Sequence, residues 1–303
     1  MTPDPRSTTG FGHGKVILFG EHAVVHGHSA IAAGMRAGVR AHATPGKGAL
    51  SAPAWQLDAQ VGDDSLPGRA IARLLERLAT DPASLDFWLE AEVPARAGLG
   101  SSAAMAVAIA RAVAARAGAS ETDVVEAVAA AEAVFHRTPS GIDAAAARCG
   151  GVGVFDRAQG WRDLALKSPF EIVVGITGMP HDTGALVASV ARLCDATPVA
   201  RGLLSTMGDL ARAGADALRD GDLGALARLF NLAHGLLCGI GVSTPEIDDM
   251  IYTARAAGAA GAKLTGAGGG GAVIVLAEER SDEVLRRWRG KGYYGFVTTI
   301  GHA

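Results

Sequence analysis

Two glycines and two serines come together in the segment 98–103, which reads Gly-Leu-Gly-Ser-Ser-Ala. The segment lies at the predicted start of an alanine-rich helix, where backbone N–H groups and the positive end of the helix dipole form a site for anions such as phosphate. A simpler interpretation is that Ser102 caps the helix. The pattern also fits a loose dinucleotide loop, but the loop after Pro94 separates it from the preceding strand, which argues against that class of site. The residues alone leave an anion site and a plain helix cap as alternatives.

Five more glycines fall within the six positions 266–271, in a segment that begins at Lys263 and reads KLTGAGGGG. It leads into a predicted strand, whereas a dinucleotide loop leads into a helix. A hairpin turn needs one or two glycines, so we infer that the backbone there closely approaches a ligand. The segment 10–15, GFGHGK, looks like a P-loop, but Thr9 and Val16 stand where that motif needs glycine and a magnesium-binding hydroxyl. A P-loop NTPase is therefore excluded.

Three charged residues are candidates for chemistry, and each also has a plain structural interpretation. Asp143 follows Ser140 at the spacing of a capping box. Glu132 lies among alanines and valines and is typical of an exposed charge on a helix. Lys15 is typical of a solvated lysine at the end of a strand. The spacing alone favours these structural interpretations.

The histidines near the N-terminus, His13, His22, His26 and His28, raise the question of a zinc site. His22 and His26 have the i, i+4 spacing of ligands on one helical face. The H-E-x-x-H order is absent, however, and the run between them is apolar and strand-like, so we reject zinc binding by this group.

The hydrophobic pattern along the chain predicts the elements that position these residues. Strands are expected at 15–19, 23–25, 38–44, 55–59, 85–93, 171–177, 262–265, 272–276 and 295–300, and helices at 66–78, 102–116, 121–136, 142–148, in four stretches between 183 and 257, and at 282–288. Runs of strands and runs of helices without strict βαβ alternation predict an α+β fold. The length of 303 residues fits two domains. We place them at 1–165 and 166–303.

Composition and charge exclude several classes of protein. The chain has 28 basic and 31 acidic residues, which is too balanced for a nucleic-acid or anionic membrane surface. Hydrophobic residues make up 49%, which excludes wholesale disorder, and no apolar run is long enough to span a membrane. The three scattered cysteines, Cys149, Cys194 and Cys238, and the polar N-terminus lead us to expect no disulfide framework and a cytoplasmic location.

Four motifs, in their order along the chain, resemble the GHMP superfamily of small-molecule kinases. The segment 94–104 resembles the phosphate loop of that family, and Lys263–Gly271 resembles its C-terminal glycine motif. The segments 14–27, GKVILFGEHAVVHG, and 136–143, HRTPSGID, are most similar to the mevalonate kinase family within it. The resemblance extends over nearly the whole chain and implies the two-domain α+β GHMP-kinase fold, with the active site in the cleft between the domains.

The resemblance also implies an activity, the ATP-dependent phosphorylation of the C5 hydroxyl of mevalonate, with ATP and Mg²⁺ as cofactors. It implies that Asp143 accepts the hydroxyl proton, that Lys15 stabilises the developing charge, and that Ser102 and Glu132 bind Mg²⁺. The other implied contacts are Gly98, Leu99, Gly100, Ser101, Ser102 and Ala103 with the ATP phosphates, and Lys15, Glu21, His22, Asp143, Thr265, Gly266 and Ala267 with the substrate. Mevalonate carries a carboxylate, so Arg137 or Arg157 is expected to pair with it, because a guanidinium binds two oxygens at once.

Two residues depart from the family pattern and keep alternatives open. Arg137 stands where glycine is usual, and Ala144 where asparagine often follows the aspartate; both flank the expected base and so affect substrate fit. The alternatives are another GHMP kinase acting on phosphomevalonate or a sugar, and a catalytically silent homologue that only binds its ligand. The retention of Lys15, Ser102, Glu132 and Asp143 argues against the silent homologue. We expect small-molecule partners only, and a monomer or homodimer.

Asn231, His234 and the segment 241–244 resemble the family's C-terminal helical region and are assigned no chemistry.

Overall fold

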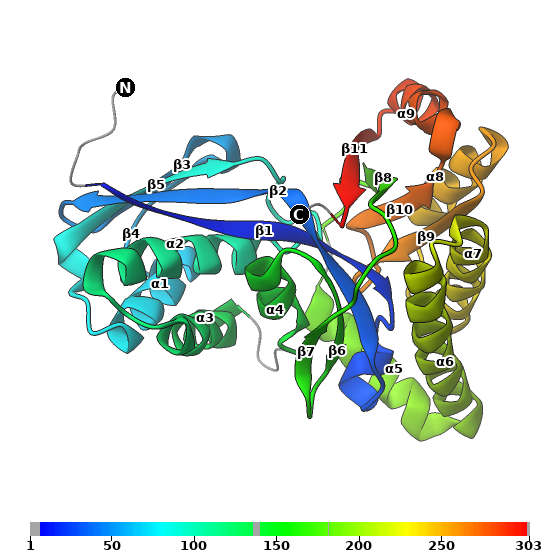
Figure 1. Ribbon diagram of the computed structural model, residues 1–303, viewed down its shortest axis with the longest axis horizontal. Helices are drawn as coiled ribbons and strands as arrows, with labels where there is room; N and C mark the ends of the chain where they lie inside the picture. Colours follow the sequence, from blue (N-terminus) through cyan, green and yellow to red (C-terminus); the bar gives the residue numbers. More distant parts are fainter. Residues whose placement is uncertain (1–6, 136–139, 181, 302–303) are drawn as a thin grey trace. The chain divides into compact units, whose positions relative to one another are not determined.

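The computed structural model describes residues 7–135, 140–180 and 182–301, which form two compact units (Figure 1). Unit 1 contains the described residues of 7–14, 37–95 and 100–150, and unit 2 those of 15–36, 96–99 and 151–301. Each unit therefore draws on several stretches of sequence. No helix in the described ranges is long and apolar enough to cross a membrane.

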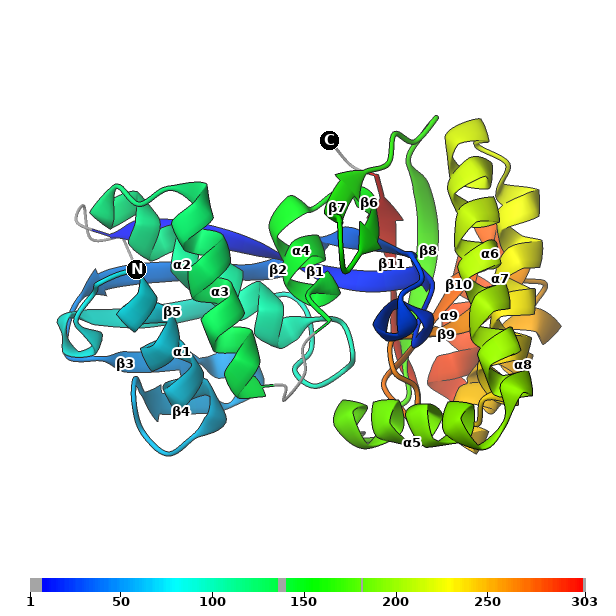
Figure 2. The same ribbon diagram turned by 90° about the horizontal axis from the view of Figure 1, so that it is seen from below.

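Unit 1 is a sheet covered by helices on one face (Figures 1 and 2). Its strands are the first part of β1 (Thr8–Phe19), the second part of β2 (Ala30–Pro45), β3 (Ala49–Ala52), β4 (Leu57–Gln60) and β5 (Leu85–Ala91). β5 pairs antiparallel with β2, with Val39 opposite Ala91, and parallel with β3. The helices are α1 (Leu66–Arg77), α2 (Ser101–Ala117), α3 (Glu121–Phe135) and α4 (Ile142–Cys149).

Local sequence explains why these helices form and how closely they pack. α1 begins after Ser65, whose hydroxyl accepts a hydrogen bond from the Gly68 N–H at 3.0 Å, as expected of an N-cap. α2 is alanine-rich and buried over most of its length, so its backbone approaches β1 directly. A Cβ at Gly12 of β1 would lie 2.2 Å from the Ala104 carbonyl oxygen, so this position accepts only glycine without displacement of the helix.

Unit 2 contains a four-stranded antiparallel sheet in the order β11-β8-β10-β9. Its strands are β8 (Phe170–Ile176), β9 (Gly261–Thr265), β10 (Ala272–Leu276) and β11 (Tyr294–Ile300). Its helices are α5 (Thr183–Ala196), α6 (Pro198–Asp220), α7 (Leu223–Gly239), α8 (Pro245–Ala256) and α9 (Ser281–Gly290). The core under α8 and α9 is centred on Trp288, which is fully buried and donates its indole N–H to the Met250 carbonyl at 2.9 Å.

A second strand group completes unit 2. β6 (Val152–Asp156) and β7 (Gly160–Asp163) form a hairpin, and β6 pairs antiparallel with Ala30–Ala33 of β2. Short 3₁₀ helices join the larger elements of both units: η1 (Ala23–His26) and η4 (Glu278–Arg280) in unit 2, and η2 (Pro53–Trp55) and η3 (Pro82–Ser84) in unit 1.

The mixed α+β class is confirmed, and most expected helices lie within one or two residues of their predicted bounds. The strand predicted at 23–25 is wrong, because the segment forms η1. Gly20 and Gly27 flank it with φ of 89° and 88°, and together they close a tight turn that a three-residue apolar run cannot reveal. The prediction at 55–59 is wrong in part, since Trp55 ends η2 and the strand starts at Leu57. Strands β3, β6 and β7 were not predicted. The boundary near residue 165 stays a prediction.

Candidate active site

The start of α2 has the form of an anion site in unit 1. The residue before the helix is Gly100, with φ of 73°, and no side chain caps the helix. The interpretation of Ser102 as the helix cap is therefore wrong. Ser101 and Ser102 occupy the first turn, where their hydroxyls join the backbone amides and the positive end of the dipole.

Asp143 is the second residue of α4 in the same unit. The N-cap of this helix is Gly141, with φ of 87°, and no side chain caps it. Ser140 accepts only a long hydrogen bond of 3.4 Å from the Ile142 N–H, so the capping-box interpretation is wrong. The half-buried Asp143 carboxylate stands in the first turn of α4, at the positive end of the helix dipole.

Glu132 lies near the end of α3, and its side chain is only 3% exposed. The expectation of an exposed helix charge is therefore wrong. A buried carboxylate is costly unless a cation or hydrogen-bond donors compensate it. Together with the Ser102 hydroxyl of the same unit, Glu132 provides the hard oxygen donors that Mg²⁺ requires, so this donor set fits the implied metal.

Unit 2 holds Lys15, a buried residue of β1. Its backbone N–H donates to the Leu99 carbonyl at 2.9 Å, which ties β1 to the segment before α2. The positive charge of Lys15 lowers the pKa of both Glu21 and Lys263, so the three charges act on one another. The interpretation of Lys15 as a solvated lysine is therefore wrong.

Glu21 and Lys263 form an ion pair inside unit 2. Lys263 is fully buried and Glu21 is 3% exposed. The Lys263 ammonium donates to the Glu21 carboxylate, to the Leu264 carbonyl at 2.7 Å and to the Ile17 carbonyl at 3.3 Å. Burial raises the pKa of Glu21 and lowers that of Lys263, and the ion pair opposes both shifts. The charged pair is thus held by three acceptors around one ammonium.

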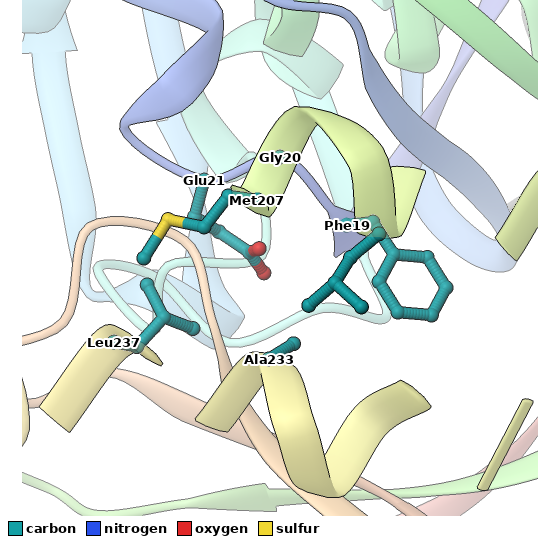
Figure 3. Close-up of a pocket in the computed structure, with 7 residues that line it drawn as sticks. Phe19, Gly20, Glu21, Met207, Ala233 and Leu237 are labelled. Atoms are coloured by element: carbon teal, nitrogen blue, oxygen red, sulfur yellow. The ribbon is translucent and has the colours of Figure 1, made fainter. Parts of the chain in front are cut away.

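The Glu21 carboxylate reaches into a small pocket (Figure 3). The figure shows its two oxygens between Met207 of α6 and Ala233 and Leu237 of α7. The full lining is Phe19, Gly20, Glu21, Met207, Leu210, Ala233 and Leu237. Because the other lining side chains are apolar, Lys263 is the main charge that compensates this carboxylate.

His22 follows Glu21 in a strained conformation, with φ of 59° and ψ of −45°. Its Nε2 lies 2.8 Å from the Ala267 carbonyl oxygen. Because a carbonyl only accepts, Nε2 carries the proton and Nδ1 is an acceptor. Nδ1 is buried and has no hydrogen-bond partner in the described part of the chain. Burial lowers the pKa of His22, which keeps the ring neutral at pH 7.

The glycine-rich loop between β9 and β10 has a backbone that requires its glycines. All five have positive φ: Gly266, Gly268, Gly269, Gly270 and Gly271. A Cβ at Gly268 would lie 2.2 Å from the Val242 carbonyl oxygen, and one at Gly270 would lie 2.7 Å from that of Met179. The close approach at these two positions is therefore to the chain's own backbone. A Cβ at Gly266 would lie 3.8 Å from the Gly98 carbonyl oxygen, an ordinary contact distance, so space remains beside this glycine.

The three remaining residues that were expected to contact the substrate are Thr265, Arg157 and Arg137. Thr265 donates its hydroxyl to the Ile17 carbonyl at 2.9 Å and accepts from the Ile17 N–H at 2.8 Å, so the only hydrogen-bond donor of its side chain already has a partner within unit 2. Arg157 is exposed in the turn between β6 and β7. Arg137 lies outside the described residues, as do His136, Thr138 and Pro139 of the same motif.

Sequence reasoning missed the role of Lys263 and the fixed position of Asn231. Lys263 is the one charged residue in the otherwise uncharged strand β9. A charged side chain inside a buried strand indicates a buried partner of opposite charge. Asn231 of α7 donates to the Ala260 carbonyl at 3.0 Å and accepts from the Ala262 N–H and from Arg255. It therefore joins α7 to β9 and α8.

Comparisons with known proteins place these features in a family. Residues 65–151 match the GHMP kinases N terminal domain, and residues 215–294 match the GHMP kinases C terminal family. A mevalonate kinase of Aeropyrum pernix is 34% identical over 282 residues, which cover 88% of this chain and 87% of that protein. A mevalonate kinase of Thermococcus onnurineus is 35% identical over 300 residues, with 89% of each chain covered.

Solved structures agree with these relatives. The chain superimposes on the mevalonate kinase of L. major in complex with R-mevalonate with a TM-score of 0.86 and 29% identity, covering 100% of this chain and 99% of that one. The Methanococcus jannaschii mevalonate kinase shares the fold, with a TM-score of 0.83 at 22% identity and 99% of this chain covered. The chain belongs to the GHMP kinases, and within them to the mevalonate kinases.

Proposed function

We propose that this protein transfers the γ-phosphate of ATP to the C5 hydroxyl of mevalonate, giving 5-phosphomevalonate and ADP. The observation that carries the proposal is the similarity to mevalonate kinases along nearly the full length of both chains. The charged and hydroxyl residues that phosphoryl transfer requires are all present.

The first turn of α2 and the residues before it supply the groups proposed for the ATP phosphates, and Ser102 and Glu132 of unit 1 those proposed for the metal. The uncapped first turn of α2, Ser101, Ser102 and Ala103, offers amides and hydroxyls to the phosphates, with Gly98, Leu99 and Gly100 preceding it. Ser102 and Glu132 would hold Mg²⁺. When bound, the ion neutralises charge on the transferring phosphate.

Asp143 is proposed to take the proton of the attacking hydroxyl. Its carboxylate lies in the first turn of α4, and an ionised carboxylate is the form that accepts a proton. Lys15 is proposed to stabilise the negative charge that develops on the oxygens in transfer. The buried setting of its side chain limits the competition from water for this charge.

The substrate contacts are proposed on Glu21, His22, Thr265, Gly266 and Ala267, with Lys15 and Asp143 at the reacting hydroxyl. Nδ1 of His22 is a buried acceptor that a substrate hydroxyl can satisfy. Glu21 holds its charge through Lys263. Arg157, or Arg137 from the undescribed segment, is proposed for the mevalonate carboxylate.

The proposal is tested by an ATP-coupled assay with mevalonate, phosphomevalonate, galactose and homoserine. Mevalonate is expected to give the highest kcat/KM. The variant Asp143→Asn should lower kcat by at least about 100-fold while ATP affinity changes little. The matched control is Asp216→Asn, at a side chain that is 72% exposed on α6, which should leave kcat unchanged.

The outcomes separate the alternatives. Turnover of phosphomevalonate or galactose in preference to mevalonate would assign another GHMP kinase activity. ATP binding without turnover of any acceptor would identify a silent homologue. Near-normal kcat in Asp143→Asn would reject the assigned base. A cytoplasmic location and a monomeric or dimeric state stay predictions from the sequence.

A further inference from the structure

A histidine, a cysteine and an aspartate come together in unit 2, away from the residues assigned above. His234 and Cys238 are four residues apart on one face of α7, and Asp248 lies in the first turn of α8. The Cys238 Sγ is 3.4 Å from His234 Nε2 and 3.9 Å from an Asp248 carboxylate oxygen, which is 3.3 Å from His234 Nε2. Three potential metal ligands thus surround one point.

These separations match the edges of a zinc coordination tetrahedron. With Zn–S of about 2.3 Å, Zn–N of about 2.05 Å and Zn–O of about 2.0 Å, tetrahedral angles give S–N, N–O and S–O edges of roughly 3.6, 3.3 and 3.5 Å. The observed edges are 3.4, 3.3 and 3.9 Å. An ion therefore fits at the centre after movements of a few tenths of an ångström.

The ligand types also suit a divalent cation. Imidazole, thiolate and carboxylate are all ligands of Zn²⁺, and binding of the metal releases the protons that the free ligands carry. One thiolate and one carboxylate then balance the charge of a divalent ion.

A hydrogen bond outside the ligand set holds the carboxylate. Ser243 donates its hydroxyl to the Asp248 carboxylate at 2.6 Å. Cys238 is exposed and Asp248 half-buried, so an ion can enter from solvent, while His234, 6% exposed, closes the inner side. Such an arrangement leaves a fourth, outward position for water.

We propose that His234, Cys238 and Asp248 bind a thiophilic divalent cation of the Zn²⁺ class. The ion bridges the last two turns of α7 to the first turn of α8 and so braces the connection 240–244. Within that connection, the Val242 carbonyl accepts a hydrogen bond of 2.8 Å from the Gly269 N–H. The metal therefore helps to hold the glycine-rich loop in place through the hydrogen bond between Val242 and Gly269.

The test uses the full chain, stripped of metal with a chelator and without nucleotide. Titration with Co²⁺, read by absorbance, should give one equivalent of tetrahedral Co²⁺ with a thiolate charge-transfer band, and Zn²⁺ should abolish that band by competition. Cys238→Ser should remove the band and weaken Zn²⁺ binding by more than about 100-fold, since the loss of an outer partner alone costs about 10–100-fold. Ser243→Ala, the outer partner, should weaken Zn²⁺ binding by that smaller factor.

The matched control is Cys149→Ser, at a cysteine of α4 in the other unit, which should bind both ions like the parent chain. Absence of a thiolate band, or equal Zn²⁺ affinity in Cys238→Ser and the parent, overturns the proposal and leaves the three side chains as an ordinary hydrogen-bonded group. Because Cys238 is exposed, its replacement is not expected to impair folding.

Discussion

The ion pair between Lys263 and Glu21 yields a quantitative prediction about stability. Both side chains are buried, and the ammonium also donates to the Ile17 and Leu264 carbonyls. Lys263→Met keeps a long unbranched chain but leaves the Glu21 carboxylate without its main compensating charge. Removal of one partner from a buried pair costs about 3–5 kcal/mol in the free energy of unfolding. For a unit of roughly 150–250 residues this corresponds to a fall in Tm of about 6–20 °C.

The loss should depend on pH, with a sign given by the carboxylate. Burial already raises the pKa of Glu21, and Lys263 is the first opposing cause. Without Lys263 that pKa rises further. A group with a raised folded-state pKa contributes stability below its unfolded value of about 4.5 and loses it as the pH rises through the folded value. The deficit of Lys263→Met should therefore be smallest at and below about pH 4.5 and grow as the pH rises above that value.

The assay is urea unfolding of the parent and variants at several pH values. The double variant Lys263→Met/Glu21→Leu replaces both charges by apolar groups of similar size and should recover most of the loss. The control Lys291→Met breaks only a surface pair with Asp249 and should change stability by no more than about 1 kcal/mol. A loss below about 1 kcal/mol, a deficit independent of pH, or a double variant as unstable as the single one would refute the reasoning.

Two further predictions concern the metal ligand and the glycine-rich loop. Glu132→Gln removes a charged ligand and should raise the Mg²⁺ concentration for half-maximal rate by at least about 10-fold. The control Glu126→Gln, at a side chain that is 56% exposed on the same helix, should leave that concentration unchanged. Equal Mg²⁺ dependence in the two variants would reject Glu132 as a ligand. Gly268→Ala should destabilise unit 2 by at least about 2 kcal/mol, because alanine is strained at a φ of 80° and its Cβ would meet the Val242 carbonyl oxygen at 2.2 Å. Chemical denaturation measures this loss, and stability within experimental error of the parent would show that the loop relaxes without strain.

Local signals in the sequence predicted most of the elements. The helical spacing at 66–78 predicted α1, which the structure shows to begin after the N-cap Ser65, and the spacing at 142–148 predicted α4, because periodicity is visible within a few turns. The apolar run at 23–25 led to a wrong strand prediction, because the 3₁₀ turn that forms there depends on positive φ at Gly20 and Gly27. A three-residue run contains no period from which helix and strand can be told apart.

The sequence by itself determined the family, because the family's motifs occur in order along the chain. The family in turn indicated which residues take part in phosphoryl transfer. Only the tertiary structure decided how each of those residues is held. It showed that Gly100 and Gly141 precede α2 and α4, so that Ser102 and Asp143 are not caps, and that Glu132 is buried. It also brought Glu21 to Lys263, and His234 and Cys238 to Asp248. The physical reason is range: capping, turns and periodicity act over a few residues, whereas burial and charge pairing depend on residues up to 242 positions apart.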